Sequence, residues 1–469
     1  MAIADKLVYL DETKTRIRDG INALGGNLTE ADTFRSYADA LINLGPAANS
    51  IGEPGLMGFG VGICPNPPAG FTPLPSTYIL GHAQYGNYQY ADGSIMVWVP
   101  AFFYRYGHAD NPTYGDYGVN SVQILPRSAF STVEAANAAG FALHRAFYDG
   151  GEQPGVFVDK YLCSNNAGTA SSIALGNPLS SNGAHNPFSG LTGAPPDNYS
   201  GSIPAAKTRG AGFFPTSLFI NKALALLSLA HAQAATSTAA CAWHDATGVN
   251  NFPKGNNNNA LGDVNDGAVS YTSSGYSNAG KTGSGAPFAK TTHNGQDCGI
   301  ADLNGNMWEV SPGVTYQDGA YYILDPAARM ADLTEGATLA TDAWGAPGVA
   351  ANYLLLGASH GTLGTGPGTN RAIGSANAVL SSALTGLDWA GAGAGIPLAD
   401  GVGGTNLFGN DRLYDNNPQH MCPIAGGNWN NSSNAGVWCL NCNNSRTNSN
   451  NNVGFRADSA HFKRRLWRQ

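Results

Sequence analysis

The C-terminal part of the chain, from Gly426 to Arg456, constrains the fold most because a very polar composition is combined with spaced apolar residues. Eleven of the 25 residues from Asn428 to Asn452 are asparagine. A run of asparagine alone is typical of low-complexity segments. Here glycine and large apolar residues interrupt the run, at Gly427, Trp429, Gly436, Val437, Leu440, Val453, Gly454 and Phe455. Apolar residues at such intervals predict a folded backbone.

Asparagine suits the exposed side of such a backbone. It tolerates left-handed and turn conformations and bonds to its own main chain. Its short side chain also offers both a donor and an acceptor of hydrogen bonds. The segment is therefore interpreted as a rigid scaffold that presents a polar surface with replaceable side chains.

The order of these motifs resembles a known kind of variable region. Gly426-Gly427-Asn428-Trp429, the asparagine-rich middle and Gly454-Phe455-Arg456 are similar to proteins diversified by diversity-generating retroelements. The resemblance implies that adenines are mutated when a template is copied into the gene. Asparagine codons then become codons for many other residues but never stop codons. The codons of the scaffold residues are poor in adenine and are spared.

The resemblance also implies which residues bind a receptor. Trp438 is expected to be a large aromatic anchor among adaptable polar side chains, and Cys439 to be a changed tyrosine codon. The expected receptor-binding positions are Asn428, Asn430, Asn431, Asn434, Trp438, Cys439, Asn441, Cys442, Asn443, Asn444, Asn448, Asn450, Asn451 and Asn452. The expected scaffold residues are Gly427, Trp429, Gly454, Phe455 and Arg456.

Further motifs extend the resemblance over roughly residues 86–456 and imply a C-type-lectin fold of the formylglycine-generating-enzyme type. The fold class expected is α+β, loop-rich with short strands. The segments that carry this resemblance are MVWVPAFFYRY at 96–106, residues 144–165, a helix at 216–235, residues 243–267, and DLNGNMWE at 302–309. In the last motif, Asn304-Gly305 predicts a turn with positive φ, and Met307 and Trp308 are expected in the core.

Three regions are expected along the chain: a helical segment at 1–48, a Gly/Pro-rich connector at 49–85, and the lectin-like domain at 86–469. Apolar residues three or four apart predict a helix over 4–24, and a second helix is expected to run to about residue 44. The apolar seam of the first helix consists of Leu7, Leu10, Ile17, Ile21 and Leu24. This pair resembles N-terminal segments of phage tail proteins that dock on the virion or trimerise. An ordinary hairpin packed on the main domain is the alternative.

Metal sites receive little support from the sequence. Cys439 and Cys442 have a CxxC spacing and could bind zinc with Cys422 and a His, but no second CxxC exists. Residues 256–259 are expected to form a polar surface loop, and the acidic stretch 263–266 lacks the closing Glu of a calcium loop. Asp302 and Glu309 are interpreted as buried acceptors rather than as ligands. No cofactor is expected, and calcium is left open.

Composition narrows the function classes. Hydrophobic residues make up 42% of the chain and charged residues only 12%, with a net charge of −8, which argues against general nucleic-acid binding. The basic residues at 463–468 are interpreted as a solvated terminus or an intersubunit contact. The first residues do not resemble a signal peptide, and no apolar run is long enough for a membrane span. The apolar stretch 218–235 contains Lys222 and His231 and is interpreted as a core helix.

An enzyme is not expected. The formylglycine-generating enzymes carry two cysteines five residues apart shortly after the GG-W motif, whereas Asn430 and Asn431 follow Trp429 here. An HExxH motif is absent from the sequence. A degenerate oxidase is therefore the least favoured reading.

The expected function is that of a phage tail-tip or tail-fibre adhesin, made in the host cytoplasm and located in the virion. Its partners would be a host cell-surface receptor, protein or glycan, and other tail or baseplate proteins. A homotrimer is expected, because the apolar seam of the first helix must be buried and phage tail fibres and tips commonly have threefold symmetry. Several weak sites would then gain affinity by avidity. A bacterial or prophage-encoded surface-display lectin is the alternative.

Overall fold

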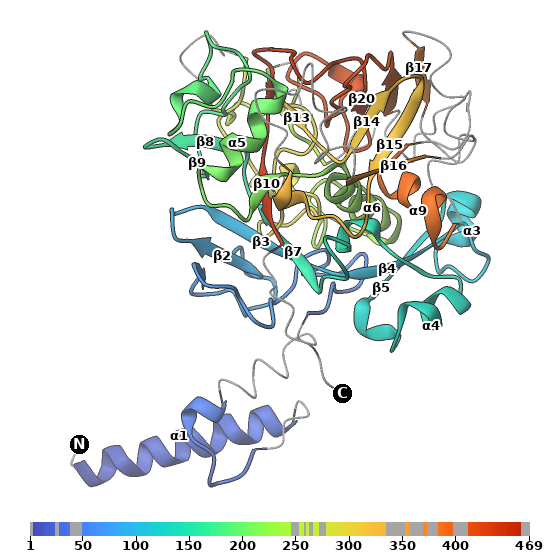
Figure 1. Cartoon of the computed structure of the whole chain (residues 1–469). Helices are drawn as coiled ribbons and strands as arrows, with labels where there is room; N and C mark the ends of the chain where they lie inside the picture. Colours follow the sequence, from blue (N-terminus) through green and yellow to red (C-terminus); the bar gives the residue numbers. More distant parts are fainter. Residues whose placement is uncertain are drawn as a thin grey trace.

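The computed structural model describes residues 3–23, 28–37, 49–244, 253–257, 259–261, 266–271, 278–333, 352–356, 369–372, 383–396 and 411–460. Over these residues the chain combines helices with several small, mainly antiparallel sheets, linked by long stretches of turn and irregular backbone (Figure 1). The predicted mixture of helices and short strands is confirmed at this level.

One six-stranded antiparallel sheet joins early and late parts of the chain. The C-terminal strand β22 pairs with β7 on one side and with β10 on the other. In spatial order the strands are β1 (Phe71–Pro73), β2 (Asn87–Tyr90), β3 (Ile95–Pro100), β7 (Gly155–Asp159), β22 (Ala457–Ser459) and β10 (Phe213–Pro215). β3 lies within residues 94–100, where β-branched and aromatic residues in close succession predict a strand.

A second six-stranded sheet contains strands of the asparagine-rich segment itself. Two of its pairs are parallel: β21 lies beside β13, and β20 lies beside β18. In spatial order the strands are β17 (Thr369–Ala372), β18 (Arg412–Asp415), β20 (Leu440–Asn441), β19 (Ile424–Ala425), β13 (Trp308–Val310) and β21 (Val453–Gly454). The candidate segment is thus built into a sheet at two places.

Smaller sheets complete the body. They are β5–β4–β6 (Val122–Pro126, Phe102–Tyr106, Ala142–Leu143), β14–β15–β16 (Val314–Gln317, Ala320–Leu324, Tyr353–Leu355), β8–β9 (Cys163–Asn166, Thr169–Ser172) and β11–β12 (Asn256–Asn257, Ala260–Leu261). The short 3₁₀ helices are Gly118–Asn120, Arg127–Ala129, Arg145–Phe147, Phe188–Gly190, Tyr199–Gly201, Phe288–Thr291, Met330–Asp332 and Ser432–Asn434.

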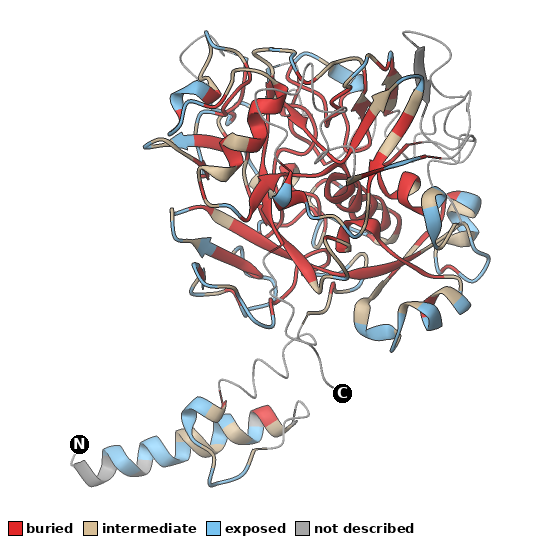
Figure 2. Ribbon diagram, in the orientation of Figure 1, coloured by how far each residue is buried: buried red, intermediate tan, exposed pale blue. Residues whose placement is uncertain are grey.

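Helix α6 (Leu218–Ala234) runs through the core, where Figure 2 shows it almost wholly buried. The Oγ of Ser217 caps it by accepting the Ile220 N–H. Apolar side chains on every face explain its burial, and the predicted core helix is confirmed. Other α-helices in the described residues include α1 (Ile3–Ala23), α3 (Tyr114–Tyr117), α4 (Val133–Ala138), α5 (Ser202–Lys207) and α9 (Gly386–Gly393). None of the helices in the described part of the chain could span a membrane.

The predicted connector at 49–85 is part of the folded body. Ile51, Phe59 and Val61 are fully buried in the main hydrophobic core, and β1 pairs with β2. Glycines with positive φ at 58 and 60 allow tight turns that return these apolar side chains inward. A Gly/Pro-rich composition therefore marks turns here rather than a separate spacer.

Two other expected surface regions are also buried in part. Asn256 and Asn257 are buried, in contrast to the polar surface loop expected at 256–259. Residues 330–410 are rich in Gly, Ala and Thr, a composition that predicts long surface excursions, but Trp389 of α9 is buried, and its indole N–H donates to the Leu143 carbonyl at 2.9 Å. Both regions therefore contribute to the core.

Helix α1 matches the helix predicted over 4–24. Residues 34–37 are also helical, while Leu24 and the remainder of the second predicted helix lie outside the described residues. In Figure 1, α1 lies below the body and β20 lies near its top. The two ends that the sequence singles out are therefore far apart.

Candidate functional site

The asparagine-rich segment 426–456 alternates between buried anchors and outward-facing asparagines. Trp429 is 8% exposed and Phe455 1%, which confirms the prediction that both are buried. Asn430 and Asn434 are exposed, and Asn428 is buried. The half-buried asparagines are Asn431, Asn441, Asn443, Asn444, Asn448, Asn450, Asn451 and Asn452. Ten of the eleven asparagines thus reach solvent at least in part.

Arg456 anchors the end of this segment. Its fully buried guanidinium forms a bidentate pair with the Glu309 carboxylate, with Nε–Oε2 and Nη2–Oε1 distances of 3.0 Å each. The same group also donates to the carbonyls of Asp159, Lys160 and Ala301. Bidentate pairing gives both strength and a fixed orientation. The Gly-Phe-Arg motif is thereby tied to the DLNGNMWE motif.

The two carboxylates of DLNGNMWE act as buried acceptors. Glu309 pairs with Arg456, and Asp302 Oδ2 accepts the Gly283 N–H at 2.7 Å. Burial raises the pKa of Asp302 to about 6. Gly305 has a φ of 76°, as its place in a tight turn requires, and Met307 and Trp308 are buried as predicted. Among the described residues, no group of three or more His, Cys, Asp or Glu could hold a metal ion.

A second buried ion pair supports the strand that follows. Asp159 pairs with Arg209, with Nη1–Oδ1 and Nη2–Oδ2 distances of 2.5 and 3.0 Å. Asp159 Oδ2 also accepts the N–H of Ala457 at the start of β22. The C-terminal strand is therefore fixed directly after the candidate segment ends.

The backbone of the asparagine-rich segment is held by the main chain of distant segments. Several of its carbonyl oxygens accept a hydrogen bond from a backbone N–H elsewhere. These bonds are Asn417 N–Cys442 O at 3.0 Å, Cys422 N–Asn444 O at 2.8 Å, and Ser200 N–Arg446 O, Tyr199 N–Asn448 O, Trp308 N–Asn452 O and Ser181 N–Val453 O at 2.9 Å. Main-chain bonds do not depend on side-chain identity, so the backbone course is compatible with many sequences.

Some asparagine side chains bond within the segment. Asn431 Oδ1 accepts the Asn428 N–H at 2.7 Å, and Asn441 Oδ1 accepts the Asn443 N–H at 2.9 Å. Asn448 Oδ1 accepts the Ser445 N–H at 3.0 Å. These contacts stabilise local turns in the manner common for asparagine.

Further asparagines are tied to one another or to the rest of the body. Asn450 Nδ2 donates to the Tyr199 hydroxyl at 2.7 Å, and the side chains of Asn443, Asn444 and Asn448 bond in a row. Four asparagines make no side-chain hydrogen bond within the described part of the chain, namely Asn430, Asn434, Asn451 and Asn452. These four are the most available for a ligand.

Trp438 is not the exposed anchor expected from the sequence. It is 2% exposed and belongs to the main core, and its ring centroid lies 6.0 Å from Lys222 Nζ in α6. Cys439 and Cys442 are buried as well. As side chains they cannot contact a receptor in this conformation, and the same holds for buried Asn428. Val437 and Leu440 pack in the same core, which explains why this stretch turns inward.

The thiols of this stretch are unreactive. Burial raises the pKa of Cys439 to about 12 and also raises the pKa of Cys442. Both therefore stay protonated near neutral pH, whereas nucleophilic or metal-binding cysteines are thiolates. Cys422 is likewise buried. Of the acidic stretch considered for calcium, Asp266 accepts the N–H groups of Ala268 and Ala286, and residues 262–265 lie outside the described residues.

The buried histidines are also in structural positions. Burial lowers the pKa of His144 and of His293 to about 3, and that of His231 to about 4. All three are therefore neutral near pH 7. The His231 ring bonds to the Gly55 N–H and to the Ala240 carbonyl, which fixes residues 55 and 240 against α6.

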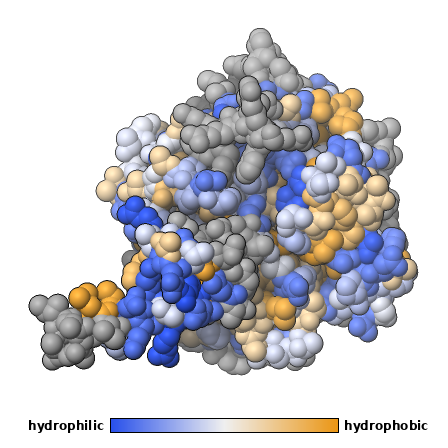
Figure 3. Space-filling model, turned by 90° about the horizontal axis from the view of Figure 1, so that it is seen from below, coloured by the Kyte–Doolittle hydropathy of each residue, from blue (hydrophilic) through white to orange (hydrophobic). Residues whose placement is uncertain are grey.

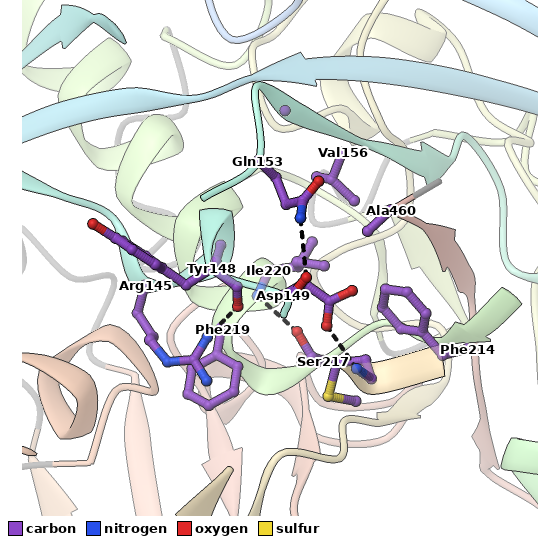
Figure 4. Close-up of a pocket in the computed structure, with 13 residues that line it drawn as sticks. Arg145, Tyr148, Asp149, Gln153, Val156, Phe214, Ser217, Phe219, Ile220 and Ala460 are labelled. Carbon is purple, nitrogen blue, oxygen red and sulfur yellow. Dashed lines mark hydrogen bonds between the residues drawn. The ribbon is translucent and has the colours of Figure 1, made fainter. Parts of the chain in front are cut away.

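A small pocket lies beside the start of α6. Figure 4 shows Arg145, Asp149 and Ser217 among its lining residues. Arg145 donates to the carbonyls of Tyr148 and Leu324, and Asp149 Oδ1 accepts the Met330 N–H. The cavity volume of about 10 Å³ is the room of one water molecule. It is too small for an organic ligand.

Sequence reasoning missed the residues that support the segment from below. Ser181 and Tyr199 come from distant loops and have no motif. Lys222 did have a signal, because it is a charged residue in an otherwise apolar helix. Asp411 precedes β18 and accepts the Trp438 N–H, a contact that only the fold brings about.

No protein-family model matches the chain, and no curated protein matches it. The function of the surface is therefore inferred from its own residues.

Proposed function

We propose that this chain is a receptor-binding protein of a phage tail tip or tail fibre. Its asparagine-rich C-terminal surface binds a protein or glycan on the host cell, and adenine-directed copying diversifies that surface. The observation that carries the proposal is the contrast between backbone and side chains in residues 428–452. Buried anchors and main-chain bonds fix the backbone, while ten of eleven asparagines reach solvent.

The proposed domain is C-type-lectin-like, of the formylglycine-generating-enzyme type. Contacts between the motifs that suggested this family support it. Arg456 of the Gly-Phe-Arg motif pairs with Glu309 of DLNGNMWE and donates to the carbonyls of Asp159 and Lys160. Three motifs that are far apart in sequence therefore meet at one buried guanidinium.

The chemistry of the surface suits recognition. Amide side chains donate and accept hydrogen bonds and so adapt to a protein or to a sugar. A backbone that is already fixed lowers the ordering cost of binding. Asn430, Asn434, Asn451 and Asn452 are the strongest contact candidates, because their side chains have no hydrogen-bonded partner in the described residues.

The N-terminal segment is proposed to attach the protein to the virion and to form a homotrimer. Leu7, Leu10 and Ile17 of α1 are 61%, 52% and 39% exposed. Figure 3 shows a hydrophobic patch towards the start of this segment, beside a strongly hydrophilic stretch. In proteins most helical stability comes from the packing of an apolar face, so an uncovered apolar seam calls for a partner.

A prophage-encoded or bacterial surface-display protein would use the same surface. The neighbouring genes discriminate between the two: tail genes and a reverse transcriptase support the phage tail. A degenerate oxidase is disfavoured by the burial and protonation of Cys439 and Cys442.

Two measurements test the proposal. The codons of residues 426–456 are compared with a nearby near-identical repeat, and differences confined to adenines are expected. Binding of purified protein to host cells is then measured for a variant with Asn430, Asn434, Asn451 and Asn452 changed to Ala. Loss of binding is expected, while the control change of exposed Asn66 and Asn177 to Ala leaves binding intact. Unchanged binding of the first variant would contradict the proposal.

A further inference from the structure

Lys222 lies directly beneath the candidate surface. Its ammonium group, on the buried helix α6, donates to three consecutive backbone carbonyls, with distances of 3.4, 3.2 and 3.4 Å to the oxygens of Val437, Trp438 and Cys439. Lys222 is 1% exposed, and no carboxylate of the described residues lies within ion-pair distance of it. The peptide oxygens are thus the acceptors that satisfy this buried ammonium.

Asp411 holds the same turn from its amide side. Its Oδ2 accepts the Trp438 N–H at 2.6 Å, and the carboxylate is almost fully buried. A Cβ on Gly436 would lie 1.7 Å from Asp411 Oδ1, so a residue with a side chain at 436 would displace either the Asp411 carboxylate or the turn. Lys222 and Asp411 therefore hold residues 436–439 through hydrogen bonds to three backbone carbonyls and one backbone N–H, and this set of bonds is called the grip below.

The position of this turn makes the grip important. It separates the asparagines at 428–434 from those at 441–452. β20 begins immediately after it, at Leu440, and pairs with β18 and β19. A displacement of residues 436–439 would therefore shift both halves of the asparagine-bearing surface relative to each other.

We infer that Lys222 and Asp411 are positioning residues that fix the backbone of residues 436–439 whichever side chains stand on the surface around it. Both residues contact main-chain atoms, which every amino acid except proline supplies in full. Substitution of the surrounding asparagines consequently leaves the grip intact. The importance of these hydrogen bonds for receptor recognition rests on the proposed function, whereas their fixing of the backbone at 436–439 does not.

Amide hydrogen exchange of the full chain tests the inference without any receptor. Lys222→Met removes the three donated hydrogen bonds and keeps most of the side-chain volume. We expect exchange in residues 436–442 to become at least about tenfold faster, since hydrogen bonds to charged groups are among the stronger ones. Exchange in β3 and β7 should change much less. Lys222→Arg should restore part of the local protection.

The matched control is Lys160→Met. Lys160 is also buried, and it donates to the carbonyls of Ala83 and Asp297 and to Asn87 Oδ1, away from the surface. The Lys160→Met change should leave hydrogen exchange in residues 436–442 close to that of the wild type. If Lys222→Met leaves this segment protected, or raises exchange equally in all segments, the inference is overturned.

A second variant keeps the inference falsifiable if Lys222→Met does not fold. Changing Asn430, Asn434, Asn451 and Asn452 to Ala should leave exchange in 436–442 within about twofold of the wild type, because the grip is main-chain only. Faster exchange there would show that surface side chains hold the turn and would overturn the inference. Loss of cell binding by the same variant is a separate readout that tests the proposed function alone.

Discussion

The two ends of the molecule both face solvent, but they do so in opposite ways. In residues 428–452 most asparagine side chains face outward from a backbone that main-chain hydrogen bonds to distant segments fix in place. In α1 the apolar side chains of Leu7, Leu10 and Ile17 face outward from a helix, whereas Ile21 near its end is buried.

This difference separates two kinds of exposed surface. A polar surface on a fixed backbone is stable in a single chain and can change its side chains at little cost. An exposed apolar seam gains free energy only when something covers it, at roughly 25 cal/mol per Å². The C-terminal surface thus suits reversible recognition, and the N-terminal seam suits permanent assembly.

The largest expected effect is a loss of stability when the buried residues that anchor the C-terminal segment are changed. Arg456→Met leaves Glu309 buried without its partner, which should lower the free energy of unfolding by about 3–5 kcal/mol. Phe455→Ala should cost about the same, because it opens a cavity. Urea denaturation checks both. Arg329→Met is the control: its pair with Asp332 is half exposed, so its loss should cost less than about 1 kcal/mol. Equal losses for Arg456 and Arg329 would refute the anchor role.

The pH dependence of the free energy of unfolding tests the support of the C-terminal segment at Asp411. Burial raises the pKa of Asp411 from 3.8 to about 7, against the opposing pull of the Trp438 N–H and of Lys222. The folded state therefore holds this proton more tightly than the unfolded state between about pH 4 and 7. By linkage, stability contributed by Asp411 falls as pH rises through that window and stays low above it.

Asp411→Asn should remove this dependence. The wild type minus variant difference in unfolding free energy should decline by about 2–4 kcal/mol between pH 4.5 and 8, at roughly 1.4 kcal/mol per pKa unit. Titrations by the other groups largely cancel in the difference. Parallel curves for the two proteins over this range would show that Asp411 is ionised in the folded state throughout.

At the N-terminal end the expected effect is on assembly rather than on the stability of the body. Leu7, Leu10 and Ile17 changed together to Gln should convert the proposed homotrimer to a monomer in light scattering. The melting of the body should stay within about 0.5 kcal/mol of the wild type, since these are exposed positions. Exposed Lys6 and Arg16 changed to Gln on the same helix are the control and should leave the assembly intact. A monomeric wild type at micromolar concentration would contradict the scheme.

Truncation tests the same point only if it spares the core. Asn49 accepts the indole N–H of Trp98 and donates to the Pro154 carbonyl, and Ile51 is fully buried. A shortened chain should therefore begin before Asn49. A start near residue 52, at the edge of the supposed connector, would damage the body and confuse loss of assembly with loss of folding.

Local patterns predicted what depends on local residues. The apolar stretch of α6, the strand β3 and the turn at Gly305 follow from side chains within a few positions, and the structure confirms them. Burial of Trp429 and Phe455 followed from isolated apolar residues in a polar run. Trp438 had the same appearance but was interpreted as exposed, because the sequence does not show that α6 lies under it.

The remaining errors have the same origin. Residues 49–85 look like a spacer because glycine and proline dominate, and only long-range pairing reveals that they complete a sheet and the core. The contacts of Lys222 and Asp411 with residues 437–439 join positions roughly 200 and 27 apart in the chain. Contacts over such separations leave no periodic signal in a single sequence.

The smallest expected effects distinguish the asparagines from one another. Asn430, Asn434, Asn451 and Asn452 changed singly to Ala should each alter the free energy of unfolding by no more than about 0.5 kcal/mol. Their side chains make no hydrogen bond to other described residues, so no such bond is lost. Asn450→Ala should cost about 1 kcal/mol, because the buried Tyr199 hydroxyl loses its partner. Tyr199→Phe combined with Asn450→Ala should cost less than the sum of the two single changes, since they share one bond.

If all five asparagines prove equally neutral, Asn450 belongs with the free positions of the surface. If all five are costly, residues 428–452 are a structural element, and the contrast with α1 loses its basis.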